Sequence, residues 1–152
     1  MIRITGVYAH LFYHFIWATK HRQPWLTEAL ENAVAMIVGS KAKELNLEII
    51  AAEGAFDHYH VLLRSNQNCC PADIAKHFKG SSSHYINNKL LRGSCQRFYW
   101  QDGYGVVSVS PDAVEVVAEY VRHQKQHHEG GKLIDSLEQF IIAERQTPTN
   151  PP

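Results

Sequence analysis

The chain has 152 residues, 45% of them hydrophobic and 20% charged, with 15 basic and 15 acidic side chains. This composition suits one domain with a buried core; it excludes a wholly disordered chain and, at zero net charge, a uniformly cationic histone-like protein. No run of 18 apolar residues is present, which excludes a membrane-spanning helix, and the first residues lack the apolar segment of an export signal. We therefore expect a cytoplasmic protein with free cysteines and no membrane association.

The spacing of apolar residues predicts a strand, a helix and two more strands in the first half of the chain. The first strand is expected over 11–18, which is rich in aromatic residues, and the helix over about 27–46, with Thr27 as its N-cap. Further strands are predicted over 47–53 and 58–65, separated by a turn.

The second half of the chain predicts another helix, a strand and a C-terminal helical region. Pro71 suits the first turn of a helix, whose buried face is expected to carry Ile74, Phe78, Ser81 and Tyr85. A strand region interrupted at 102–103 is predicted over 98–109. Ser110 and Pro111 are typical of a helix start, and this helix is expected to run to about His128. A short amphipathic helix over 133–141 should follow.

The resulting β-α-β-β-α-β order predicts a ferredoxin-like α+β sandwich. Its antiparallel sheet is expected to have helices on one face, with the helix from Ser110 added at the C-terminus. The sequence contains no linker and no internal repeat, so we predict a single domain over 1–146 and a disordered polar tail over 147–152.

A histidine pair, His58 and His60, occupies alternate positions of the third predicted strand. Side chains at i and i+2 of a strand share a face, so the two imidazoles can share a divalent cation or bind one phosphate. Tyr59 should point to the opposite face. With ten histidines in the chain, about 0.7 such pairs are expected by chance, so an ordinary surface pair is an open alternative. We expect both imidazoles on a solvent-reachable face.

Tyr120 and Gln124 lie four residues apart on the predicted helix 110–128 and should share one face. Both can be ordinary residues beside the apolar stripe of this helix. Alternatively, Gln124 adds an amide oxygen to a metal held by the two histidines, and Tyr120, its hydroxyl exposed, is a nucleophile beside it. Two imidazoles and an amide oxygen favour a labile Mg²⁺ or Mn²⁺ over a structural zinc.

Positive charge is concentrated between residues 58 and 101, where six basic residues and one acidic residue give a net charge of +5. The rest of the chain must carry the compensating negative charge. This asymmetry favours an anionic partner on one side of the molecule, although a solvated charged face is an alternative.

Six short motifs together resemble the single-tyrosine HUH transposases of the insertion sequence 200/605 group and their REP-associated tyrosine transposase relatives. They are YHFIWATK (13–20), DHYHVLL (57–63), KHFKG (76–80), WQDGYG (100–105), SVS (108–110) and YVRHQ (120–124). The resemblance covers about residues 10–130. Tyr59 departs from it, because a smaller aliphatic residue is usual between the two histidines; we expect this change to affect packing rather than chemistry.

The resemblance implies a homodimeric, ferredoxin-like (RRM-like) enzyme that acts on single-stranded DNA without a nucleotide cofactor. It implies that His58, His60 and Gln124 bind Mg²⁺ or Mn²⁺, and that Tyr120 cleaves DNA to form a 5′-phosphotyrosine. Hairpins at element ends are the implied substrates. Phosphate-binding cations and base-stacking aromatics are then expected at Lys76, Lys79, Lys89, Arg92, Arg97, Trp100 and Tyr104, with a core position as the alternative for Trp100.

Three alternatives stay open. A domesticated REP-associated tyrosine transposase or nickase would perform the same chemistry without mobilising an element. A non-catalytic RRM-like nucleic-acid-binding module would normally show an aromatic and basic strand motif where this chain has His-Tyr-His. A small metalloenzyme unrelated to DNA would leave the basic stretch unexplained.

Overall fold

The computed structural model describes residues 6–126 and contains one four-stranded antiparallel sheet with the strand order β2-β3-β1-β4. The strands are β1 (Leu11–Ala18), β2 (Glu48–Gly54), β3 (His58–Ser65) and β4 (Gly105–Val109). The helices are α1 (Glu28–Glu44), α2 (Pro71–Tyr85) and α3 (Val114–Arg122), with shorter helical turns η1 (Lys20–Arg22), η2 (Ile86–Leu90) and η3 (Pro111–Ala113). The predicted ferredoxin-like α+β class and the order of its elements are confirmed.

Local sequence signals account for most element boundaries. The Thr27 side chain accepts a hydrogen bond from the Leu30 N–H at 3.5 Å, as expected of an N-cap, and Pro71 lies in the first turn of α2. The buried face of α2 carries Ser82 rather than the predicted Ser81. The hydrogen bonds of the Ser82 hydroxyl explain why Ser82 faces the core: it donates to the Phe78 carbonyl and accepts from the Trp100 indole at 2.9 Å.

The predicted strand over 98–109 is shorter than expected, because regular pairing begins only at Gly105. Before it, Trp100 makes a single bridge to Thr19. The Lys79 ammonium donates to the carbonyls of Gln101 and Gly103 at 2.8 and 2.7 Å. A side chain on α2 therefore satisfies carbonyls that a continuous strand would pair with its neighbour.

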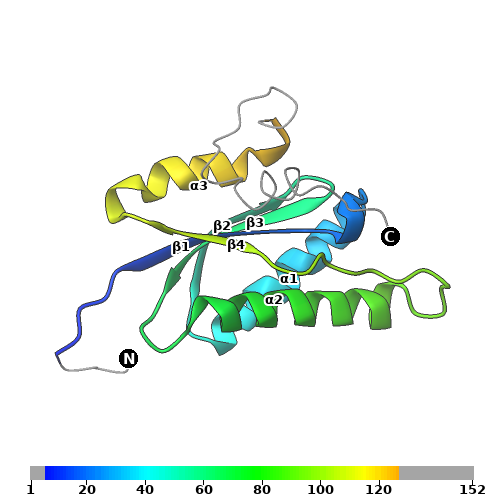
Figure 1. Cartoon of the computed structure of the whole chain (residues 1–152), viewed down its shortest axis with the longest axis horizontal. Coiled ribbons are helices and arrows are strands. Elements are labelled where there is room, and N and C mark those ends of the chain that lie inside the picture. Colours follow the sequence, from blue (N-terminus) through cyan, green and yellow to red (C-terminus); the bar gives the residue numbers. More distant parts are fainter. Residues whose placement is uncertain (1–5, 127–152) are drawn as a thin grey trace, which may run out of the picture.

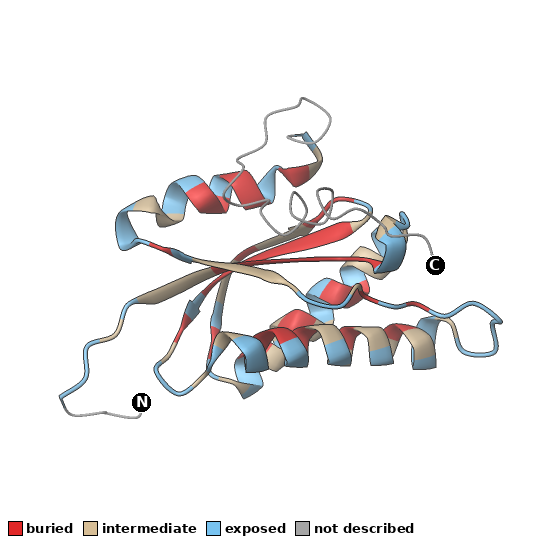
Figure 2. Cartoon of the chain, viewed as in Figure 1, coloured by how far each residue is buried: buried red, intermediate tan, exposed pale blue. Residues whose placement is uncertain are grey.

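Helices cover both faces of the sheet (Figure 1): α1 and α2 lie on one side and α3 on the other. The main core lies under α1 and α2 and contains Phe15, Trp17, Tyr59 and Phe78. A second cluster joins the sheet to α3, so buried residues occur on both sides of the sheet (Figure 2). The amphipathic α3 buries Val117, Ala118 and Val121 and therefore does not stand apart from the sheet.

The C-terminal helical region differs from its prediction. Ser110 makes no side-chain cap hydrogen bond, η3 precedes α3, and the helix is interrupted at His123, so that α3 ends at Arg122. Residues 124–126 are helical again, and the predicted end at about His128 lies outside the described residues. The predicted helix over 133–141 and tail over 147–152 lie outside the described residues. Within the described part, no helix has the length and apolar character needed to cross a membrane.

Candidate active site

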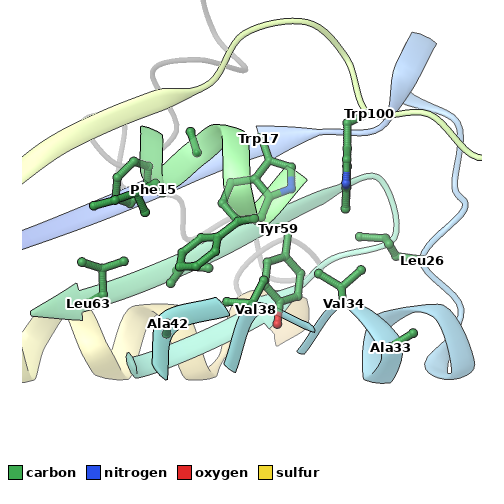
Figure 3. Close-up of a cluster of buried hydrophobic side chains, with 14 of the residues drawn as sticks. Phe15, Trp17, Leu26, Ala33, Val34, Val38, Ala42, Tyr59, Leu63 and Trp100 are labelled. Carbon is green, nitrogen blue, oxygen red and sulfur yellow. The ribbon is translucent and has the colours of Figure 1, made fainter. Parts of the chain in front are cut away.

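The two histidines of β3 face α3, and Tyr59 between them faces the opposite layer. The centroids of the His58 and His60 rings are 5.0 Å apart. Tyr59 points from β3 toward α1 beside Val34 and Val38 (Figure 3), and its ring centroid lies 5.7 Å from that of Trp17. The predicted alternation is therefore confirmed. Burial, aided by nearby carboxylates, raises the pKa of the Tyr59 phenol above its ordinary value, which disfavours this tyrosine as a nucleophile.

Tyr120 reaches the histidine pair from α3 of the same chain. Its ring meets the His60 ring edge to face, with the centroids 6.2 Å apart. Gln124 lies beside it and is fully buried. The structure thus brings together the four residues that the sequence singled out from two segments about 60 positions apart.

A break in the helix orients Gln124. His123 leaves the helical conformation (φ −118°, ψ 30°), and the Gln124 N–H donates to the Glu53 carboxylate at 2.7 Å. The Gln124 side chain folds back, so that its Nε2 donates to the Tyr120 carbonyl at 3.1 Å. Its Oε1 has no hydrogen-bond partner among residues 6–126. A buried amide oxygen in this state is suited to a cation, because an unsatisfied buried acceptor is costly.

Two carboxylates, Glu53 on β2 and Glu31 on α1, bind the residues that follow α3. Burial raises the pKa of Glu53, although its hydrogen bond from Gln124 and the nearby Lys125 oppose that shift. Lys125 pairs with Glu31 at 2.8 Å, and the second oxygen of Glu31 accepts the Gly54 N–H at 3.1 Å. Glu31 and Glu53 therefore connect residues 124–125 to α1 and to the end of β2.

A carboxylate lies behind His58. Its Nδ1 is 2.7 Å from Oδ1 of Asp57, and Arg22 donates to Oδ2 of the same carboxylate at 3.1 Å. Burial alone would raise the pKa of Asp57, but the hydrogen bond from His58 and the Arg22 guanidinium outweigh it and hold the pKa below its ordinary value. With Nδ1 engaged, the Nε2 atom is the one that can face a metal.

The donor set fits a labile divalent cation. Among the described residues, no three His, Cys, Asp or Glu side chains are grouped so as to hold a metal. The candidate ligands are instead two imidazoles and the amide oxygen of Gln124. This mixed set leaves coordination positions open and suits Mg²⁺ or Mn²⁺ better than a closed zinc site.

One expectation about this site is wrong. The two imidazoles and the Tyr120 hydroxyl were expected to be solvent-reachable, yet the exposed fractions of His58, His60 and Tyr120 are 1%, 0% and 3%. α3 contributes to this burial, because its apolar face packs on the sheet and its Tyr120 ring packs edge to face on His60.

The predicted DNA-binding residues lie in the layer of α2 and the segment that follows it. Lys76, Lys89, Arg92 and Arg97 are exposed, and Tyr104 is half-buried with its ring 6.2 Å from that of Phe15. Two others have structural contacts. The ammonium of Lys79 binds backbone carbonyls, and Trp100 is a core residue whose indole is not exposed for base stacking.

Sequence reasoning assigned no role to four residues that contact the site: His14, Arg22, Glu53 and Asp57. Asp57 directly precedes the histidine pair, a position that could have suggested a hydrogen bond to an imidazole. His14 could have been found as the one strongly polar side chain in the strand LFYHFIWA. Arg22 and Glu53 carried no local signal, because their contacts depend on the fold.

The sequence and fold match known transposases. A sequence model of the family "Transposase IS200 like" matches residues 7–124. The ISDra2 transposase TnpA of Deinococcus radiodurans is 27% identical over 126 residues, which cover 78% of this chain and 87% of that protein. The transposase of insertion sequence IS200 from Salmonella typhimurium is 26% identical over 125 residues, which cover 80% of this chain and 82% of that protein.

Two solved structures have the same fold. A Deinococcus radiodurans protein described as a transposase superposes with a TM-score of 0.63 at 28% identity, covering 82% of this chain and 98% of that one. A REP-associated tyrosine transposase bound to a REP hairpin superposes with a TM-score of 0.61 at 12% identity, covering 97% of this chain and 89% of that one. Since the family model spans nearly all of the described chain, including the histidine pair, Tyr120 and Gln124, this protein belongs to the IS200-like transposases.

Proposed function

We propose that this transposase cleaves and rejoins single-stranded DNA through a covalent 5′-phosphotyrosine on Tyr120, with Mg²⁺ or Mn²⁺ held by His58, His60 and Gln124. The observation that carries the proposal is that Tyr120 packs on the His58–His60 pair, while the buried side chain of Gln124 is hydrogen-bonded to the Tyr120 carbonyl. The buried Oε1 of Gln124 and the engaged Nδ1 atoms of both imidazoles support the metal assignment.

A divalent cation, when bound, would polarise the phosphodiester and stabilise charge on the leaving oxygen. The Tyr120 hydroxyl attacks the phosphorus, the bond from phosphorus to the 3′ oxygen breaks, and that oxygen takes up a proton to become a 3′-hydroxyl. Tyr120 loses its phenolic proton and keeps the 5′ phosphate. A later attack by a 3′-hydroxyl reverses these changes and joins new strands, so no nucleotide cofactor is required.

Access to the site requires movement of α3. Tyr120 is only 3% exposed, so a DNA strand cannot reach its hydroxyl while α3 lies flat on the sheet. The attachments of residues 124–125 to Glu31 and Glu53 are polar and partly exposed, and α3 is only nine residues long. The free energy needed to move this short helix away from the sheet is therefore lower than the free energy needed to open the main core.

The substrate that we propose is hairpin-bearing single-stranded DNA. The exposed cations Lys76, Lys89, Arg92 and Arg97 can bind its phosphates, and Tyr104 offers a partly exposed ring. We also propose a homodimer, because the sheet ends in the edge strands β2 and β4, which can pair with a second copy. A monomer in sedimentation that retains full cleavage would contradict the dimer.

The test is incubation with labelled single-stranded hairpin DNA and Mg²⁺ or Mn²⁺, followed by a denaturing gel. We expect a covalent protein–DNA adduct and a shortened strand, both abolished by chelation. Binding without any adduct would favour a non-catalytic nucleic-acid-binding module.

A further inference from the structure

A third histidine, His14, lies behind the candidate metal site. It is on β1 and is 1% exposed, and its Nε2 is 2.8 Å from Nδ1 of His60. The two residues are diagonal neighbours across β1 and β3, since His60 pairs with Ile16 and His14 pairs with Leu62. Side chains at such positions lie on the same face of the sheet and within reach of each other.

Packing alone does not account for an imidazole at this position. His14 pairs with Leu62 on β3 and with Val107 on β4, and Phe12 and Ile16 flank it on the same face. An aliphatic side chain would fill this apolar surface without the cost of burying a polar ring. The imidazole contributes a hydrogen bond to one defined atom of a candidate metal ligand.

The direction of this hydrogen bond follows from the chemistry of imidazole. A metal-binding histidine must present a nitrogen lone pair, and in a neutral ring only one nitrogen carries hydrogen. If Nε2 of His60 is to face the cation, Nδ1 must carry the hydrogen and donate it. His14 Nε2 is the acceptor at the required distance, and His14 then carries its own hydrogen on Nδ1.

We propose that His14 is a positioning residue that holds His60 in the Nδ1–H tautomer and aims its Nε2 at the metal; this inference rests on the proposed metal site. It makes the two ligands unequal, because His58 is supported by the Asp57 carboxylate and His60 by a neutral ring. A neutral acceptor suits this position, since an anion among Leu62, Val107 and Ile16 would be far more costly to bury.

The first test is a nitrogen NMR measurement of histidine tautomers in the metal-free, full-length wild-type protein. We expect hydrogen on Nδ1 and a lone pair on Nε2 for His60, and a lone pair on Nε2 for His14. The opposite arrangement, with the lone pair of His60 on Nδ1, overturns the proposal. This measurement does not depend on activity or on the folding of any variant.

The second test is a calorimetric titration with Mn²⁺. His14→Leu should weaken binding by about 10- to 100-fold, the usual effect of removing the hydrogen-bond partner of a metal ligand. His14→Gln should restore most of the affinity, because its amide oxygen can accept the same hydrogen bond. Ile16→Val is the matched control, on the same strand and face and opposite His60, and should bind Mn²⁺ like the wild type.

The outcomes distinguish the metal site from the role of His14. Wild-type protein that fails to bind Mn²⁺ overturns the proposed metal site. If the wild type binds Mn²⁺ and His14→Leu binds it equally well, only the role of His14 is overturned. The same holds if His14→Leu binds Mn²⁺ more weakly and His14→Gln does not restore the affinity.

Discussion

At the scale of single residues, the Tyr120 hydroxyl is the group on which the proposed chemistry depends. Tyr120→Phe should abolish strand cleavage and the covalent adduct together, because no other group would accept the 5′ phosphate. The ring that packs on His60 remains, so the free energy of unfolding should change by no more than about 1 kcal/mol. A denaturing gel and a urea titration measure the two effects.

DNA affinity should also survive this substitution, since the candidate phosphate-binding residues lie on other elements. Tyr13→Phe is the matched control, a partly buried tyrosine packed on Phe15 that should retain cleavage. A covalent adduct formed by Tyr120→Phe would show that another residue is the nucleophile.

Gln124 acts at the same scale but should be less critical. In Gln124→Ala, water can replace the amide oxygen at the metal, so cleavage should fall and be partly recovered at higher Mn²⁺ concentration. The variant also lacks the hydrogen bond to the Tyr120 carbonyl, and stability should fall by roughly 1 kcal/mol. Initial cleavage rates across a Mn²⁺ series measure the recovery. The exposed Gln126→Ala is the control, and equal metal dependence of the two variants would contradict the assignment.

At the scale of elements, the position of α3 decides whether the site is open. Lys125→Ala removes the ion pair between Lys125 and Glu31, in which the lysine side chain is 40% exposed. Such a pair contributes roughly 0–1 kcal/mol after solvent screening. Amide hydrogen exchange in α3 should therefore accelerate by at most about fivefold, while exchange in β1 and β3 stays unchanged.

Lys41→Ala provides the comparison, because its ion pair with Glu44 lies within α1. It should leave α3 exchange as in the wild type. If Lys125→Ala slowed exchange in α3, or accelerated the whole sheet equally, the attachment would not control this element separately.

At the scale of the whole molecule, the candidate DNA-binding cations and the candidate active site lie on opposite sides of the sheet. The exposed cations belong to α2 and the segment after it, whereas the candidate site lies across the sheet under α3. Binding to single-stranded DNA should weaken steeply with salt. The double substitution of Arg92 and Arg97 by Gln should reduce the salt slope by about 0.7 for each phosphate that the protein no longer neutralises. Fluorescence anisotropy across a salt series measures this slope.

Lys43→Gln, which removes an exposed charge from α1, should leave that slope unchanged. Cleavage by the Arg92 and Arg97 double variant at saturating DNA should match the wild type, since neither residue touches the site. An unchanged salt slope would remove these two arginines from the DNA-binding surface.

Local patterns predicted most of the fold. β1 and β3 occupy their predicted residues, and α1 begins at its predicted cap. These features depend on periodicity and capping signals within a single segment, so they can be read from the sequence without knowing the fold. The strict alternation of a strand likewise placed His58 and His60 on one face and Tyr59 on the other. The short motifs correctly indicated the transposase family as well.

By itself, then, the sequence determined the elements, their order, the family and four candidate site residues. Only the tertiary structure decided that those four residues are buried, that Glu53 binds the backbone of Gln124 where the helix breaks, and that His14 contacts His60. It also decided that Trp100 lies in the core and that Lys79 binds backbone carbonyls. The physical reason is separation along the chain: the His14–His60 and Glu53–Gln124 contacts join residues 46 and 71 positions apart. Contacts of that kind depend on how whole elements pack, and local spacing does not encode them.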